Sequence, residues 1–160
     1  LDGLWAGNVS FPRKALLAME ERILQASMFA HEDKHLGLVA KESGMSAVFA
    51  PGLAADHLYM KDWHGMLTDA EAFGRAQRAL SQLHPHLGEF DADGLPEPLN
   101  PLVAAAVVAS DRPWVRRAEL ASLKAATWVG ESLGAHRTAE RLAFVASQIA
   151  RRQGRRAGTD

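Results

Sequence analysis

The sequence predicts an all-α protein, a single compact bundle of five to seven helices with irregular connections and no substantial sheet. Apolar residues recur every three or four positions along several stretches, which is the spacing of one face of a helix. Alternating apolar and polar residues, the pattern of a half-buried strand, are scarce. The chain has 160 residues, 48% of them hydrophobic, which is long enough to bury a core without disulfides or a metal.

The longest helical pattern runs from about Ser10 to Ser43. Ser10 is expected to cap the first free N–H groups, and Gly44 to end the helix. An unbroken helix of this span would approach ~50 Å at 1.5 Å per residue, which is long for a domain of this size. We therefore expect a bend or a break within it.

This stretch contains the pattern H-E-x-x-H, as His31-Glu32-Asp33-Lys34-His35. Histidines four apart on one face of a helix can both bind zinc or another divalent metal, and Glu32 would then be the catalytic base that activates a metal-bound water. A third ligand has to come from elsewhere, and His57 and His64 are near candidates. The pattern makes a metal-dependent hydrolase, or a metal-binding protein, the alternative function.

Three features disfavour that alternative. Asp33 and Lys34 are charged, whereas the two middle positions of a buried metallopeptidase helix are usually uncharged. Lys41 stands where an extended metal motif would need a third histidine, and no second ligand pair follows. We therefore favour two histidines at the edge of a core face, with the cofactor left unknown.

The residue pattern in the middle of the chain predicts two further helices. One is expected over 53–67, rich in aromatic residues and histidines. The second should start at Thr68-Asp69-Ala70-Glu71, which has the spacing of a capping box. A seam follows at 84–101, where three prolines in six residues favour an extended path. The expected organisation is one domain, 1–160, with this seam between an acidic N-terminal part and a basic C-terminal part.

Three helices are expected after the seam. Residues 102–109 are apolar on all sides, so we expect a buried central helix. The next helix should start at Pro113, capped by Ser110 or Asp111, and turn Trp128 inward. The last helix should open near His136 and fray after Gly154.

Charge is unevenly distributed along the chain. Through Asn100 there are eight basic and fourteen acidic residues, and after it there are ten basic and five acidic ones. Such asymmetry indicates a charged partner, although the two halves could equally attract each other. The candidate partner-binding residues are the arginines of the last helix and its tail: Arg137, Arg141, Arg151, Arg152, Arg155 and Arg156. A helix-turn-helix motif over 120–149 is disfavoured, because Glu140 occupies a position that should be apolar.

Several classes of protein are disfavoured by the sequence. The absence of cysteine removes thiol catalysis and cysteine-type zinc sites and fits a reducing compartment, so we expect a cytoplasmic location. The first residues lack the pattern of a signal peptide, and no apolar run is long enough to span a membrane. We expect a non-catalytic helical interaction or regulatory module that binds a protein or associates with itself, with nucleic acid as a second kind of partner.

Overall fold

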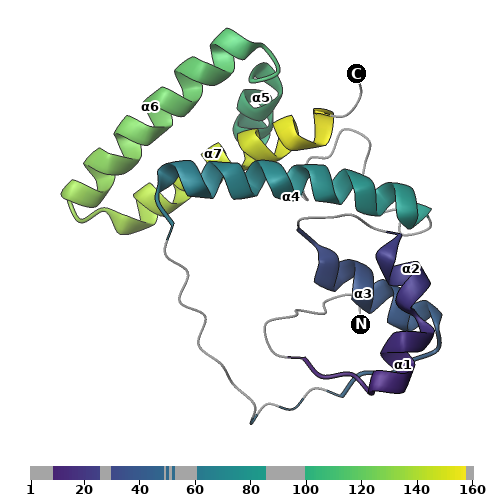
Figure 1. Cartoon of the computed structure of the whole chain (residues 1–160). Helices are drawn as coiled ribbons and strands as arrows, with labels where there is room; N and C mark the ends of the chain where they lie inside the picture. The colour runs from purple at the N-terminus through teal and green to yellow at the C-terminus, as the bar shows by residue number, and fades with distance from the viewer. Residues whose placement is uncertain are drawn as a thin grey trace.

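The computed structural model of the chain describes residues 9–25, 30–48, 50, 52, 61–85 and 100–157. These ranges contain seven α-helices and no β-strand, which confirms the predicted all-α bundle (Figure 1). The helices are α1 (Arg13–Ala18), α2 (Glu20–Leu24), α3 (Glu32–Glu42), α4 (Trp63–Leu83), α5 (Pro101–Ala109), α6 (Pro113–Ser132) and α7 (His136–Arg156).

The predicted long first helix is broken, as its length led us to expect. Helices α1 and α2 meet at Met19, and α3 starts only after His31. Ser10 is not the cap, because Pro12 is the residue before the first turn. Gly44 follows the end of α3 with a φ of 77°, the left-handed conformation expected of a glycine that stops a helix. Met19, Val39 and Ala40 form a small core among these three helices.

Helix α4 begins earlier than the capping box predicted. Asp62 is its N-cap and accepts a hydrogen bond from the N–H of Gly65 at 2.7 Å. Thr68 and Glu71 therefore lie inside the helix, and the prediction that a helix starts at Thr68 is wrong. Residues 53–60 of the other predicted helix lie outside the described part of the chain, as do residues 86–99 of the seam.

Helices α4 and α7 pack together through two glycines. A Cβ atom added to Gly74 would lie 2.0 Å from the carbonyl oxygen of Arg151, and one added to Gly154 would lie 1.9 Å from that of Glu71. The two backbones thus touch where the helices cross, and only glycine fits on either side. The expected fraying after Gly154 is wrong, because α7 continues to Arg156 and Gly154 is buried.

Helix α5 is not the buried central helix that its composition predicted. Val107 is its one buried residue, and Leu102 is 81% exposed. The helix is short and packs on α7, so only one side of it is covered. The central position belongs to α7, which packs against α4, α5 and α6 (Figure 1).

Helices α6 and α7 form an antiparallel hairpin joined at Leu133–Ala135 (Figure 1). Gly130 lies against Ala139 where the hairpin closes. Pro113 occupies the first turn of α6 as predicted, but Arg112 is the N-cap and neither Ser110 nor Asp111 caps the helix. No helix in the described part of the chain is long and apolar enough to cross a membrane.

Candidate functional site

The most unusual surface of the protein is the side of α6 that faces away from α7. Its indole side chains, Trp114 and Trp128, are 69% and 68% exposed. At 100° per residue, Trp114, Ala121, Ala125 and Trp128 fall within an arc of ~60°. Ala118 and Val129 widen the same arc, and both are exposed. We call these six residues the outer face of α6.

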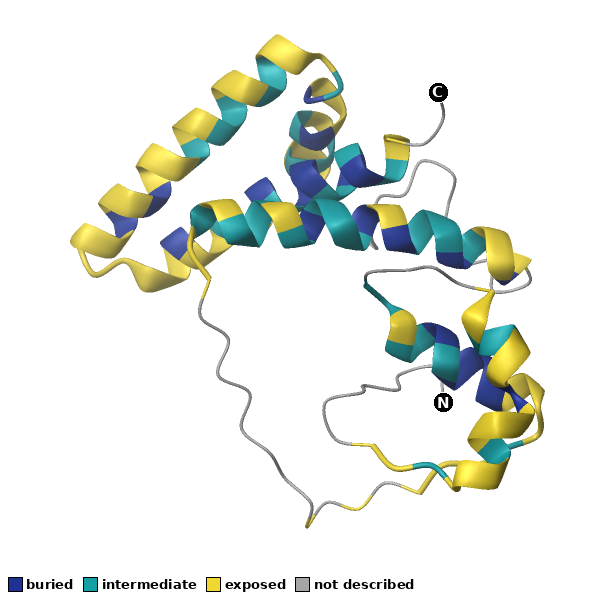
Figure 2. Cartoon of the chain, viewed as in Figure 1, coloured by how far each residue is buried: buried dark blue, intermediate teal, exposed yellow. Residues whose placement is uncertain are grey.

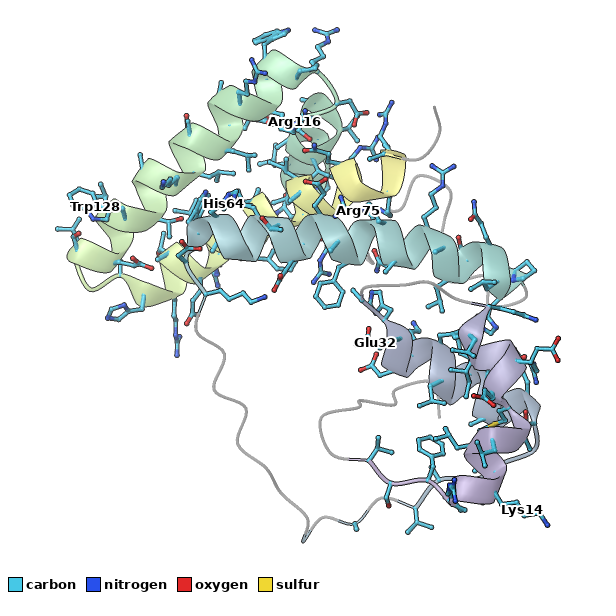
Figure 3. All side chains as sticks on the ribbon, in the orientation of Figure 1. Lys14, Glu32, His64, Arg75, Arg116 and Trp128 are labelled. Carbon is cyan, nitrogen blue, oxygen red and sulfur yellow. The ribbon has the colours of Figure 1, made fainter. Side chains whose placement is uncertain are left out.

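The opposite side of α6 is the one that packs against α7. Thr127 and Gly130 are buried against α7, and Leu120 and Leu123 are half-buried. Figure 2 shows exposed residues along α6, and Figure 3 labels Trp128 where the helix nears α7, with its side chain directed away from the bundle. The prediction that Trp128 points inward is therefore wrong. The helix is apolar on two sides, and α7 covers only one of them.

The charged residues around this face are mostly basic. Exposed charges on α6, its N-cap and the first turns of α7 are Arg112, Arg117, Lys124, Arg137 and Arg141 against Glu131 and Glu140. Within the described ranges none of these seven makes an ion pair. Arg117 and Lys124 lie seven residues apart along one edge of the outer face, and we call this pair the basic flank.

The two histidines of the H-E-x-x-H pattern do not share a helical face. His31 precedes α3 with a φ of 62°, a left-handed conformation that is strained for a residue with a Cβ atom. Its ring packs edge-on against Phe73 of α4, with ring centroids 4.8 Å apart. His35 lies inside α3 and contacts His84 instead. The i, i+4 geometry that a metal would need is lost because His31 is not helical.

His35 belongs to a buried chain of hydrogen bonds. Its Nε2 lies 3.1 Å from the carbonyl oxygen of Arg22, and its Nδ1 lies 2.9 Å from Nε2 of His84. Nδ1 of His84 lies 3.0 Å from Oε1 of Glu42, and Arg22 donates to the other oxygen of that carboxylate. Both rings are only 4% exposed. This chain connects α2 and α3 to the end of α4.

The acceptors in this chain assign a hydrogen to one nitrogen of each ring. The carbonyl of Arg22 and an ionised Glu42 only accept, so His35 must carry a hydrogen on Nε2 and His84 one on Nδ1. Both nitrogens of His35 are used within the protein, so neither is available to a metal.

Burial and hydrogen bonding together set the directions of the pKa shifts in this region. Burial lowers the pKa of His35 and of His31 below the ordinary 6.5. Burial acts to raise the pKa of Glu42, but the hydrogen bonds and charges of His84 and Arg22 outweigh it and lower that pKa below 4.5. The carboxylate of Glu42 is therefore ionised at neutral pH.

The arginines near the C-terminus are not a frayed basic tail. Arg152 makes a two-bond ion pair with Asp111, at 2.8 and 2.9 Å, and Arg156 pairs with the same carboxylate. Arg155 donates to the side chain of Gln77 at 3.0 Å, and Arg151 lies over the ring of Phe73 at 5.6 Å. All four contact α4 or the turn before α6.

The remaining predicted site residues are scattered. Arg137 and Arg141 are exposed on the first turns of α7, where a partner can reach them. Glu32 stands at the start of α3 and His64 at the start of α4, well apart along the fold (Figure 3). His57 lies outside the described residues. Within the described ranges no three histidine, aspartate or glutamate side chains are grouped as a metal would need.

The outer face of α6 is the candidate that the sequence analysis missed. Its signal was present in the sequence as two tryptophans fourteen apart, with alanines between them on the same side of the helical wheel. Leu120 and Leu123 mark the inward side of α6, and Trp128 lies ~80° from the first and ~140° from the second around the helix. The general preference of tryptophan for burial outweighed the periodicity in the prediction that Trp128 points inward.

Comparisons of the chain with protein-family models, with curated proteins and with solved structures find no match.

Proposed function

We propose that this protein is a non-catalytic helical interaction module that binds a protein partner through the outer face of α6. One observation carries the proposal: Trp114 and Trp128 stand more than two-thirds exposed on the same side of one helix. Large side chains in water cost free energy unless a partner covers them, and tryptophan is enriched among the residues that dominate protein interfaces. Contiguous exposed apolar surface on a folded protein generally marks a site of interaction.

The geometry gives a metal-dependent hydrolase no comparable support. The pattern His31-Glu32-x-x-His35 is split between a strained residue before α3 and a ring whose two nitrogens bond within the protein. Recognition of nucleic acid through the C-terminal arginines is weakened because Arg152 and Arg156 both pair with Asp111. Arg137 and Arg141 stay in the proposal as exposed basic residues beside the interface.

The proposal is tested by photo-crosslinking from the outer face. The full chain carries a photoreactive amino acid at Ala121, midway between the two tryptophans, and is irradiated in an extract of its source cells. A distinct crosslinked protein is expected, and excess unlabelled wild-type chain should compete it away. Excess W114A/W128A variant should not compete, because it lacks the two side chains that the partner covers.

The matched control places the same photoreactive residue at Gln82, which is exposed on α4. A product that forms equally from Gln82, or that the double variant competes as well as the wild type, contradicts the proposal.

A further inference from the structure

We infer that the partner on the outer face of α6 is an amphipathic helix with acidic residues beside its apolar stripe. The inference rests on the proposed function and specifies the chemistry of the partner. Three features of the described residues support it: the length and shape of the face, the charge beside it, and the repulsion that an antiparallel second copy would meet.

The length and shape of the outer face of α6 suit the docking of a second helix. Trp114 and Trp128 are separated by fourteen residues, ~21 Å along the helix axis at 1.5 Å per residue. Between them the face presents Ala118, Ala121 and Ala125. Small side chains allow the axis of a second helix to come close, and the two indoles can enclose it at either end. About four turns of helix cover this length, so the apolar stripe of the partner needs residues every three or four positions over ~14 residues.

The charge beside the face selects an acidic partner. Arg117 and Lys124 are exposed along one edge, separated by two turns, and neither has an ion-pair partner in the described ranges. Arg112, Arg137 and Arg141 add positive charge at the two ends of the helix, while Glu131 and Glu140 oppose them. Carboxylates placed two turns apart on the partner would meet both residues of the basic flank. Such pairs mainly speed association and fix the register of the bound helix.

A second copy of this chain fits this surface less well. An antiparallel pair of α6 helices centred on Ala121 would place Trp114 of one copy level with Trp128 of the other. In an antiparallel pair the same flank of each helix faces its copy, so Arg117 of one copy would lie close to the level of Lys124 of the other. Like charges brought together in this way oppose association.

The test measures the affinity of the full chain for three synthetic helical peptides of about 16 residues. They share one apolar stripe, and their flanking positions are all glutamate, all glutamine or all lysine. Fluorescence anisotropy of the labelled peptides should show the glutamate peptide binding at least 10-fold more tightly than the lysine peptide, with an affinity that falls several-fold as salt is raised. Replacing Trp114 or Trp128 with alanine should weaken binding by about 30-fold each. R117E/K124E should reverse the preference between the peptides.

Phe144→Ala is the matched control, because Phe144 is an exposed aromatic residue of α7 outside the outer face. It should leave all three affinities unchanged. Equal binding of the glutamate and lysine peptides would overturn the acidic partner, and so would no detectable binding of the glutamate peptide at millimolar concentration. Tighter binding of a single-stranded oligonucleotide would overturn it too, as would dimerisation that W114A/W128A abolishes. The proposed function fails separately, if no protein crosslinks from Ala121.

Discussion

The ring of His35 has both nitrogens hydrogen-bonded inside the protein, and this makes folding sensitive to acid. Burial lowers its pKa below 6.5, so the folded chain favours a neutral ring. A further proton would place a positive charge on a ring that is only 4% exposed, where burial opposes it. His31, whose pKa burial also lowers, responds to pH in the same direction.

We expect the free energy of unfolding to fall as the pH is lowered from 7.5 through 6.5 towards 5.5. In this range the unfolded chain takes up protons at His31 and His35 that the folded chain resists. The contribution of these two histidines to the free energy of unfolding is therefore present above pH 6.5 and lost as the pH falls below it. Urea denaturation at a series of pH values measures the effect. His35→Asn should cost about 1 kcal/mol at pH 7.5, the value of one hydrogen bond, and flatten the dependence on pH.

His136→Gln is the control for this prediction, because His136 is exposed at the start of α7. It should leave the slope of stability against pH as it is in the wild type. An equally steep slope in His35→Asn would show that His35 is not its source.

At the scale of the elements, α4 and α7 are held by backbone contact at Gly74 and Gly154. We expect Gly74→Ala and Gly154→Ala each to lower the free energy of unfolding by about 3 kcal/mol, because the added methyl group meets a carbonyl oxygen of the facing helix and forces the helices apart. Thermal or urea denaturation measures the loss.

Gly130→Ala is the control within the same fold. Its added Cβ would lie 3.5 Å from that of Ala139, an ordinary contact, so the variant should be neutral or up to about 1 kcal/mol more stable. Similar losses in all three alanine variants would mean that helix geometry, rather than the crossing of α4 and α7, sets the cost.

The sequence predicted the class and most of the C-terminal helices because local signals decide them. Pro113 and His136 mark helix starts within a residue or so, and Gly44 ends α3 as its position suggested. Where tertiary contacts decide, local signals misled. Asp111 looked like a cap but pairs with Arg152, and Gly154 looked like a helix end but lies in a helix crossing. No local sequence pattern shows which distant residue will pair with a given side chain.

The candidate site was less predictable for a related reason. His31 and His35 have the right residue types and spacing for a metal, but the backbone at His31 leaves the helical conformation and separates them. The outer face of α6 was readable from periodicity, but two apolar sides of one helix give no local indication of which side is buried. Only the position of α7 settles that.

At the scale of the whole molecule, helix packing falls into two groups. Helices α1, α2 and α3 form one group, in which α2 packs against α1 and α3. Helices α4, α5, α6 and α7 form the other, in which α7 packs against the other three. His35 with His84 and His31 with Phe73 connect the groups. The outer face of α6 lies on the second group, away from these connections (Figure 2). A partner can therefore bind there without opening the contacts that join the groups.

The most direct measurement of the central claim is hydroxyl-radical footprinting of the free chain and of its complex with the crosslinked partner. In the free chain Trp114 and Trp128 should be oxidised readily, as exposed aromatic side chains are. In the complex both should be protected together, while Phe144 of α7 should react as before. Trp114 and Trp128 reacting equally in the free chain and in the complex would contradict the claim that the outer face of α6 is the binding surface.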